Sequence, residues 1–557
     1  MTRGIGPNVV DYEKMYKEFR WDVPKEFNFA WDVVDKWAEK DPEKVALVSV
    51  APDGRSAQTH TYGDLSVLSK RFARAADRFG LKKGDKVLVM LPRIPGFYIT
   101  MIGLIRMGAI PMPTPTLSMA KDIHYRLTQS EGVAIVTTDE FASRLEEIEH
   151  DLPHLRLKIL MDGSREGWEP MHMHIGKEMG KLERSEVAPT RSDEEMLIFF
   201  TSGTEGYPKM VLHTHSYPLG HYATSFMIQD VHSSDLMWAI ADTGWAKASW
   251  GKLFGQFLLG ASVLQHNQKG KFDAKQVLDI IDRFNVTVFC APPTVYRMLI
   301  LEPALKTTNY SRLRHSLSAG EPLNPEIIKE WKDATGLDLY DFYGQTETTA
   351  IVGNCRAFPI RQGSMGKPTL GHIVKLIDDD GKEVAVGEEG NIAVKMTPLR
   401  PPGLMKEYWK RPEANQKCFL GEWYLTGDRA YKDKDGYFWF VGRADDVIKS
   451  SGYRISPFEV ESVLVEHDAV AEAAVIGVPD EVRGVVLKAF IILAPGSKPS
   501  DQLAKDIQDH VKRTTAPYKY PRVIEFVESL PKTISGKIQR KILRKMEAEK
   551  LSVSTRS

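Results

Sequence analysis

LIFFTSGTEGYPK, residues 197–209, joins a short apolar run to a loop of small and polar residues. The run Leu197–Phe200 has the composition of a buried strand, and the loop Thr201–Lys209 holds two glycines, three Ser or Thr hydroxyls and a lysine. Backbone N–H groups, hydroxyls and an ammonium group are the donors that bind phosphate oxygens. Because Pro208 precedes the lysine and Met210 follows it, the loop does not fit the P-loop pattern G-x-x-x-x-G-K-S/T. We therefore expect a phosphate loop of another type, with a polar surface loop as the alternative.

Strand-like and helical segments alternate around this stretch. Further strand-like segments are short β-branched runs, found at Lys86–Leu91, Val133–Val136 and Val286–Cys290. Helical segments have amphipathic patterns, found at Phe72–Phe79, Ala274–Phe284 and Glu326–Thr335. The last is bounded by Asn324 as N-cap, Pro325 at its first position and Gly336 after its end. This alternation predicts an α/β fold with mainly parallel sheets, whose ligands bind at loops beyond the strand C-termini.

The pattern changes after about residue 370. KLIDDDGKEV at 375–384 and YKDKDGYFWF at 431–440 each place Asp-Gly between strand-like runs, which is a hairpin signal. These hairpins predict an antiparallel sheet or small barrel. Residues 456–557 contain two helical patterns and several strands, enough for a small α+β domain.

Composition excludes several classes of protein. The chain has 557 residues with 74 basic and 74 acidic side chains, so its zero net charge gives no sign of a nucleic-acid partner. Its three cysteines are far apart, which argues against a disulfide framework and a cysteine zinc site. No apolar run approaches the ~18 residues of a membrane span, and the N-terminus lacks the apolar region of a signal peptide. We therefore expect a cytoplasmic protein.

Five further motifs contain residues suited to nucleotide chemistry. Each also has an ordinary interpretation on its own: a turn, a solvated carboxylate or lysine, or a structural salt bridge. They are SAGEP at 318–322, DFYGQTE at 341–347, YLTGD at 424–428, GRADDVIKSSGYRI at 442–455 and PKTISGKIQR at 531–540.

Together with TSGTEGYPK, and in this order, these motifs closely resemble the signature set of the adenylate-forming acyl-CoA synthetase superfamily, from about residue 25 to 545. The resemblance implies a large N-terminal adenylation domain, residues 1–444, built from two α/β subdomains and a small antiparallel β-barrel-like subdomain. A small mobile α+β domain, residues 445–557, is expected to follow, with its hinge at Asp445. The implied activity is the joining of a carboxylic acid to CoA through an acyl-adenylate, with release of AMP and pyrophosphate.

The resemblance assigns nucleotide-binding roles to residues at matching motif positions. The ATP β- and γ-phosphates are expected at Thr201, Ser202, Gly203, Thr204, Glu205, Gly206 and Lys209. The adenine is expected at Gly320, Glu321, Pro322, Asp341, Phe342 and Tyr343, with Gly344 and Gln345 completing the set. Glu347 is expected to bind Mg²⁺, Thr346 to lie near the α-phosphate, Asp428 to bind the ribose hydroxyls and Arg443 to assist it.

The remaining implied roles belong to the C-terminal domain. Lys537 is expected to bridge the α-phosphate and the carboxylate oxygen, and Arg454 to lie near the phosphates. The CoA face is expected at Ser451, Gly452, Tyr453, Arg483 and Lys512. Because Lys537 and the CoA face cannot both face one active site in one pose, the family rotates this domain between the two half-reactions.

The subgroup resembled most is the medium-chain acyl-CoA synthetases. DTGWAKASWGKLFG at 242–255 and RTTAPYKYPR at 513–522 carry this likeness. The acyl pocket is expected at Trp245 and Gly344, where glycine replaces the tryptophan of acetyl-specific relatives and leaves a deeper pocket. A medium-chain, branched, alicyclic or aromatic acid is therefore expected. Alternatives are another acyl acceptor, the same ligase making ATP from acyl-CoA, AMP and pyrophosphate, or a non-catalytic nucleotide sensor; a homodimer is a family-level expectation.

Overall fold

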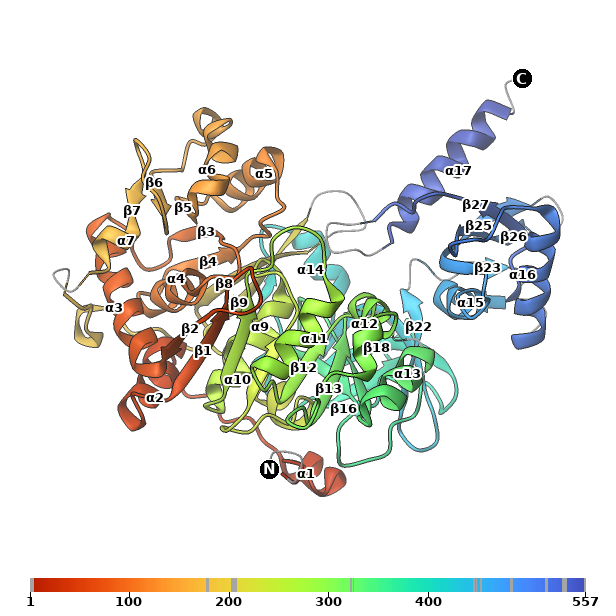
Figure 1. The fold of residues 1–557 in the computed structure, drawn as a ribbon, viewed down its shortest axis with the longest axis horizontal. Helices are drawn as coiled ribbons and strands as arrows, with labels where there is room; N and C mark the ends of the chain where they lie inside the picture. The colour runs from red at the N-terminus through yellow and green to blue at the C-terminus, as the bar shows by residue number, and fades with distance from the viewer. Residues whose placement is uncertain are drawn as a thin grey trace. The chain divides into compact units, whose positions relative to one another are not determined.

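The computed structural model of the chain describes residues 5–176, 180–201, 208–320, 323, 325–443, 446, 448–450, 453–480, 484–515, 519–532 and 538–554. Figure 1 shows the order of its elements along the chain. Two compact units are described separately: residues 1–201, 208–374 and 395–417 form the first, and residues 375–394 and 418–557 belong to the second. The expected domain boundary near residue 445 falls inside the second unit and stays a prediction.

The largest sheet of the first unit has nine strands, with a parallel centre and antiparallel edges. In spatial order they are β16 (Lys367–Pro368), β15 (Ala350–Gly353), β14 (Leu339–Gly344), β13 (His315–Ala319), β12 (Val288–Ala291), β10 (Leu236–Ala239), β11 (Ser262–His266), β1 (Val45–Val50) and β2 (Ala57–Thr61).

Both faces of this sheet are buried, as expected for parallel strands. Along β12, Phe289 and Ala291 pack with one apolar cluster, while Val288 and Cys290 pack with another. Because successive side chains of a strand point to opposite faces, β12 contributes to an apolar core on each face of the sheet. Helices α11 (Ala274–Arg283), α12 (Pro293–Ile300) and α13 (Pro325–Thr335) contribute to the first, whereas α8 (Tyr217–Ala223), the π-helical turn Thr224–Ile228 and α9 (Ala246–Lys252) contribute to the second.

A second sheet of the first unit has five parallel strands. They are β4 (Ile110–Pro113), β3 (Lys86–Met90), β5 (Ala134–Thr137), β6 (Leu157–Leu160) and β7 (Glu169–Pro170). Helices α3 (Tyr62–Arg78) and α4 (Pro95–Arg106) share one core with it, and α5 (Ala120–Ser130) and α6 (Asp139–Glu146) share the other.

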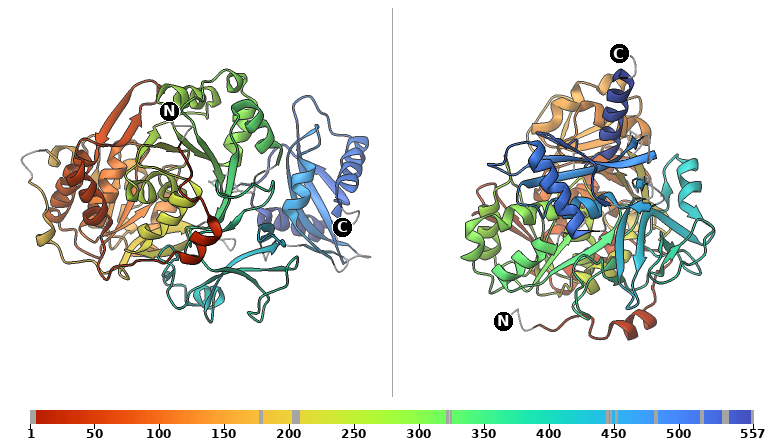
Figure 2. Two further views of the ribbon diagram at one scale, coloured as in Figure 1. Left: turned by 90° about the horizontal axis from the view of Figure 1, so that it is seen from below. Right: turned by 90° about the vertical axis from the view of Figure 1, so that its right-hand side faces the viewer.

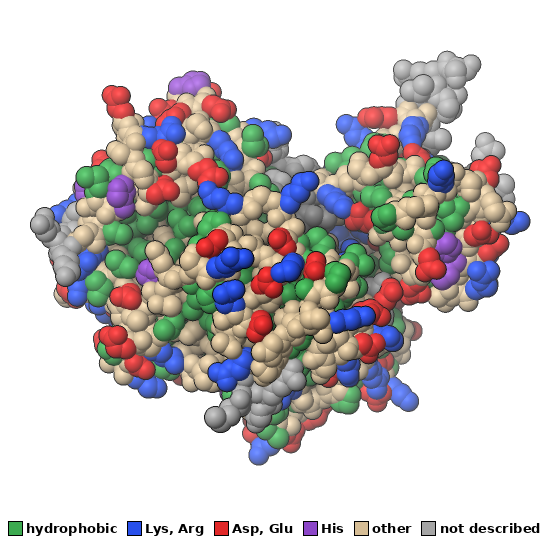
Figure 3. Space-filling model, in the orientation of Figure 1, with side chains coloured by type: hydrophobic (Ala, Val, Ile, Leu, Met, Phe, Trp, Pro, Cys, Tyr) green, Lys and Arg blue, Asp and Glu red, His purple; other side chains and the backbone are tan. Residues whose placement is uncertain are grey.

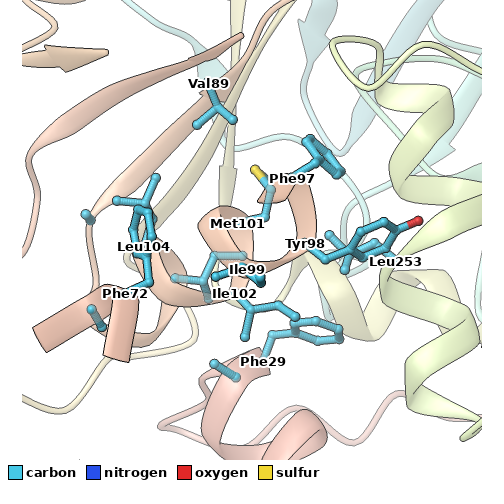
Figure 4. Packing of buried hydrophobic residues seen from close by; sticks show 14 of the residues in the cluster. Phe29, Phe72, Val89, Phe97, Tyr98, Ile99, Met101, Ile102, Leu104 and Leu253 are labelled. Atoms are coloured by element: carbon cyan, nitrogen blue, oxygen red, sulfur yellow. The ribbon is translucent and has the colours of Figure 1, made fainter. Parts of the chain in front are cut away.

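Helix α4 is buried on every side, which explains its lack of a polar face. Figure 4 shows its apolar side chains between Val89 of β3, Phe72 of α3 and Phe29. Gly103 permits the close approach of α3, because a Cβ there would lie 2.5 Å from Cδ1 of Phe72.

The loop quoted at the outset joins two antiparallel strands. Strand β8 (Glu195–Thr201) pairs with β9 (Lys209–Thr214), and β9 pairs with the two-residue strand β19 (Glu407–Tyr408). The expectation that a strand precedes the loop is confirmed. The loop lies in an antiparallel hairpin, whereas the alternation of elements predicted mainly parallel sheets, because the four apolar residues cannot reveal the direction of the next strand.

The second unit begins with the expected antiparallel sheet. Its strands are β17 (Val374–Ile377), β18 (Glu389–Lys395), β21 (Trp423–Lys432), β20 (Phe419–Leu420) and β22 (Phe438–Arg443). The hairpin signal at 431–440 is confirmed, since Lys432 pairs with Phe438 across β21 and β22.

An α+β region completes the second unit. The hairpin of β23 (Ile448–Ser450) and β24 (Tyr453–Ile455) precedes a sheet of β25 (Val470–Asp480), β26 (Gly484–Leu493) and β27 (Val523–Phe526). Helices α15 (Pro457–Leu464) and α16 (Asp501–Thr514) pack on one face of this sheet, and Figure 2 shows α16 beside the strands. Helix α17 (Arg540–Ser554) shares an apolar cluster with the other face.

The remaining helices are short. They are α1 (Tyr12–Glu18), α2 (Asp35–Lys40), α7 (Met171–His174), α10 (Phe254–Leu258) and α14 (Pro412–Cys418). Within the described residues, no helix is long and apolar enough to cross a bilayer. Basic and acidic side chains are interspersed on the face seen in Figure 3.

Candidate active site

The ends of the predicted phosphate loop lie side by side. Thr201 and Lys209 are register partners at the end of the β8–β9 hairpin. The hydroxyl of Tyr125, on α5, donates to the carbonyl oxygen of Pro208 at 2.9 Å and fixes the second end. Ser202, Gly203, Thr204, Glu205 and Gly206 lie outside the described residues, so their phosphate contacts stay predictions.

The turn after β14 is closed by its own hydrogen bonds. The hydroxyl of Thr348 accepts from the Gln345 N–H at 3.0 Å, and the Thr348 N–H donates to the Gln345 carbonyl at 3.2 Å. Outside the turn, Nε2 of His213 on β9 lies 2.8 Å from the Thr346 carbonyl oxygen. Since a carbonyl only accepts, Nε2 carries the proton. Burial lowers the pKa of His213 to about 3, so the imidazole is neutral at physiological pH.

Glu347, in the same turn, is held by Met405 and by Tyr408 of strand β19. Its carbonyl oxygen accepts from the Met405 N–H at 2.8 Å. Its carboxylate oxygen Oε1 accepts from the Tyr408 hydroxyl at 2.7 Å. The Tyr408 ring in turn lies 4.8 Å from Nζ of Lys209. The expected metal ligand and the expected phosphate-binding lysine therefore flank one aromatic side chain.

Two parallel strands of the nine-stranded sheet place the expected adenine residues near their carboxyl ends. Ser318 of β13 pairs with Asp341 of β14, so Gly320 directly follows one strand while Tyr343 lies near the end of the other. Gly320 has φ +100°, which favours glycine. Glu321 and Pro322 lie outside the described residues.

Lys247 adds a positive charge, and Asp341 a carboxyl group, near the carboxyl ends of these strands. Nζ of Lys247, on α9, donates to the carbonyl oxygen of Ala319. Burial raises the pKa of Asp341 to about 8, against the opposing effects of the Phe342 N–H and the Lys247 charge. Asp341 is therefore largely protonated at pH 7, and its carboxyl group can donate a hydrogen bond as well as accept one.

Trp250 fills the space beside Gly344. A Cβ on Gly344 would lie 2.8 Å from Cη2 of Trp250, and it would also meet the carbonyl oxygen of Thr349. The position opposite this glycine is thus occupied by an indole that the sequence analysis did not single out. Trp245, the other expected pocket residue, is half-buried and immediately precedes α9. The acyl pocket itself stays a prediction.

The second unit brings the two expected ribose residues together. Asp428 on β21 and Arg443 on β22 are register partners, and Asp428 is buried. The Asp428 N–H donates to the Thr426 hydroxyl at 3.2 Å. This arrangement supports the expectation that the two side chains act on one group.

Few of the expected CoA and catalytic residues can be placed. Nζ of Lys512 lies 2.7 Å from a carboxylate oxygen of Asp509 and 4.3 Å from the Tyr520 ring centroid. Tyr453 and Arg454 lie on β24, where Arg454 pairs with Lys449. The predictions for Asp445, Ser451, Gly452, Arg483 and Lys537 fall outside the described residues.

Comparison with known families decides the identity of this arrangement. The sequence profile described as AMP-binding enzyme matches residues 34–409, and that of the AMP-binding enzyme C-terminal domain matches residues 459–537. The chain belongs to the AMP-binding enzyme family. Membership in the adenylate-forming superfamily, predicted from the six motifs, is therefore confirmed.

The members of this family that resemble the chain include both curated proteins and a solved structure. Acyl-coenzyme A synthetase ACSM3 of Mus musculus is 43% identical over 97% of this chain and 94% of its own length. Acyl-coenzyme A synthetase ACSM4 of Homo sapiens is 44% identical over 94% of this chain and 91% of its own. The structure of the anthranilate CoA ligase AuaEII with anthranoyl-AMP superimposes with a TM-score of 0.86 at 33% identity, covering 96% of this chain and 99% of that one. The predicted α/β fold class is confirmed.

The same comparison corrects the expected location. Both curated AMP-binding relatives are described as mitochondrial, so the expectation of a cytoplasmic protein is wrong by this comparison. That expectation relied on the signal of secreted proteins, an apolar leader. Mitochondrial transit peptides are instead amphipathic and rich in Arg and Ser, so that signal does not distinguish a cytoplasmic from a mitochondrial protein.

Proposed function

We propose that this AMP-binding enzyme is an AMP-forming carboxylic acid–CoA ligase. It converts an acid, ATP and CoA to acyl-CoA, AMP and pyrophosphate through an acyl-adenylate. The observation that carries the proposal is the likeness to acyl-coenzyme A synthetases over almost the whole chain. The likeness to a CoA ligase structure that holds an acyl-adenylate supports the same intermediate.

The first half-reaction attaches AMP to the carboxylate, which gives the carboxyl carbon a group that can leave in the second half-reaction. The acid carboxylate attacks the α-phosphorus of ATP, and pyrophosphate leaves with the electrons of the broken P–O bond. Lys209 binds the β- and γ-phosphates with the other residues of the loop. Glu347 holds Mg²⁺, and this carboxylate fits the ion, which binds proteins through one or two carboxylates together with substrate phosphates. The ion neutralises charge on the phosphates when bound.

Other residues hold the remainder of the nucleotide. Asp428 takes the ribose hydroxyls, with Arg443 beside it, and the segment Asp341–Tyr343 with Gly320 holds the adenine. The paired register of Asp428 and Arg443 supports the first assignment. The adjacent ends of β13 and β14 support the second.

The second half-reaction forms the thioester. The CoA thiol attacks the acyl carbon and AMP leaves. Following the family, Lys537 stabilises the charge that develops in the first step, and rotation about Asp445 then replaces it with the CoA face around Gly452. The division into residues 1–444 and 445–557 is part of this proposal, and a homodimer stays a prediction.

The acid is proposed to be of medium chain length, branched, alicyclic or aromatic. Trp245 and Gly344 line its pocket, and the Trp250 indole beside Gly344 favours compact acids over extended ones. A pocket that differs by one methylene discriminates by about 10–200-fold. Acids that differ by one methylene should therefore differ measurably in kcat/KM.

Pyrophosphate release across a panel of acids tests the proposal. The panel is acetate, butyrate, hexanoate, octanoate, 2-methylbutyrate, cyclohexanecarboxylate and benzoate, each with and without CoA. Turnover that needs CoA is the expected result. A single burst that is unaffected by CoA would assign another acyl acceptor, and ATP binding without release on any acid would contradict the ligase.

A further inference from the structure

Tyr408 contacts both charged groups of the proposed Mg²⁺ and phosphate site. Its hydroxyl donates to Oε1 of Glu347 at 2.7 Å, and its ring centroid lies 4.8 Å from Nζ of Lys209. A hydrogen bond to an ionised acceptor is roughly twice as strong as one between neutral groups. An ammonium over an aromatic ring contributes about 0.5–1 kcal/mol where exposed and more where desolvated.

Tyr408 is itself held by contacts that involve neither charged group. Its N–H donates to Oδ1 of Asn415 at 2.7 Å, and Nδ2 of Asn415 donates back to the Tyr408 carbonyl oxygen at 3.0 Å. On its other side, Tyr408 pairs with Val211 of β9, and its side chain is buried. A side chain can orient a ligand-binding group only if its own position is fixed, and Tyr408 meets this condition.

Backbone hydrogen bonds of Met405 and Lys406 join the Glu347 turn to strand β9 as well. The Met405 N–H donates to the Glu347 carbonyl oxygen at 2.8 Å, and the Lys406 N–H donates to the Leu212 carbonyl oxygen at 2.7 Å. Residues 405–408 thus contact both the turn that carries Glu347 and the strand that begins at Lys209. The tyrosine side chain extends this connection to the charged atoms.

We propose that Tyr408 is a positioning residue for nucleotide and metal binding. Its hydroxyl donates a hydrogen bond to Oε1 of Glu347 and fixes the carboxylate plane, so that the second oxygen points toward the cation in a defined direction. Its ring limits the positions open to the Lys209 ammonium. The inference rests on the proposed roles of Glu347 and Lys209 in binding Mg·ATP.

Two substitutions separate the two contacts. Tyr408→Phe keeps the ring beside Lys209 and removes the hydrogen bond to Glu347. Tyr408→Leu removes both. Loss of a partner that orients a metal ligand typically lowers metal affinity about 10–100-fold. Tyr408→Phe should therefore raise the Mg²⁺ concentration needed for half-maximal binding by about tenfold or more, and leave nucleotide binding without Mg²⁺ unchanged.

The measurement is calorimetric binding of α,β-methylene-ATP to the full chain at a series of Mg²⁺ concentrations. This analogue cannot release pyrophosphate, so the readout is binding alone. Tyr408→Leu should show the same Mg²⁺ effect and also weaken binding in the absence of Mg²⁺. Tyr16→Phe is the matched control. Tyr16 lies on α1, and its hydroxyl donates a hydrogen bond to the His372 carbonyl oxygen at 2.8 Å, so the substitution removes a comparable bond that involves neither Glu347 nor Lys209.

Glu347→Gln distinguishes failure of the inference from failure of the proposed function. If Glu347→Gln shifts the Mg²⁺ dependence and Tyr408→Phe does not, Tyr408 does not position the carboxylate. If Glu347→Gln also leaves the Mg²⁺ dependence unchanged, the metal-binding role of Glu347 fails and the inference fails with it. A lowered thermal midpoint in Tyr408→Phe with unchanged Mg²⁺ dependence would assign the residue to stability alone.

Discussion

Lowering the pH from 7 to 5 should strongly destabilise the first unit of this enzyme. Six of its histidines are buried, and burial lowers the pKa of each: to about 3 for His213, to about 4 for His215, His315 and His372, well below the usual value for His221, and by a smaller amount for His266. An unfolded histidine titrates near pH 6.5. The unfolded state therefore takes up protons, as pH falls below 6.5, that the folded state cannot bind.

The size of the effect follows from these values. Each histidine with a folded pKa near 4 lowers the free energy of unfolding by about 2 kcal/mol between pH 7 and pH 5. The four with stated values together lower it by roughly 7 kcal/mol. Asp341 acts in the opposite sense, because its folded pKa of about 8 lies above its unfolded value. It restores about 2.5 kcal/mol over the same range.

The net loss is roughly 5 kcal/mol before His221 is counted, which is comparable to the 5–15 kcal/mol stability of a typical domain. Guanidinium unfolding of the ligand-free chain at pH 7, 6 and 5 measures it, at constant ionic strength. Tryptophan fluorescence reports mainly the first unit, because Trp423 and Trp439 are the only two of the eleven tryptophans outside it.

Proton uptake provides an independent readout. At pH 5.5, before His221 is counted, unfolding should take up about three protons: nearly one is bound by each of the four histidines with stated values, and one is released by Asp341. His315→Gln should lower this number by about one, since its imidazole Nε2 bonds the Ile228 carbonyl at 2.8 Å and a glutamine amide can replace that donor. His150→Gln is the control, because His150 is exposed. Zero net uptake, or an unfolding free energy that is unchanged between pH 7 and 5, would refute the reasoning.

The other predictions concern the half-reactions and the acid. Lys537→Ala should slow adenylation about 10²–10³-fold, as expected for loss of one stabilising donor, while thioester formation from supplied acyl-adenylate continues; equal loss of both half-reactions would remove the assigned role. Asp445→Pro should slow thioester formation more than adenylation in single-turnover experiments, and unchanged rates for both steps would contradict a hinge there. Trp250→Ala should raise the kcat/KM ratio of octanoate to butyrate about tenfold or more, because pocket size is worth about 1–3 kcal/mol for each methylene; an unchanged ratio would locate the acyl chain elsewhere.

Local sequence signals predicted single elements well. The helix expected at Glu326–Thr335 forms at Pro325–Thr335, with Gly336 at φ +71° after its end. The strand expected at Val286–Cys290 forms at Val288–Ala291. Proline, glycine and hydrophobic period act within a few residues, so one sequence is enough to reveal them. The direction of β9 relative to β8 depends on pairing between strands, which those signals do not contain.

In the candidate site too, residues marked by local motifs were predicted, and those placed by contacts between distant segments were not. The motifs identified Lys209, Glu347 and Asp428 because their loops contain unusual residue types at fixed spacings. Tyr408 was missed, since a two-residue strand has no detectable period and its contact with Glu347 spans 61 residues. Trp250 was quoted within a motif, but only the structure shows that its indole lies against Gly344.

The pairing of β19 with β9 has a consequence for synthesis of the chain. Translation delivers the β8–β9 hairpin first, then the turn that carries Glu347, and only later residues 405–408. Until Tyr408 leaves the ribosome, the nascent chain lacks the side chain that contacts both Lys209 and Glu347. A ligand stabilises only a state that can bind it. Stabilisation by bound ATP should therefore reach its full extent only after residues 405–408 have been made, and until then the growing polypeptide relies mainly on its apolar cores.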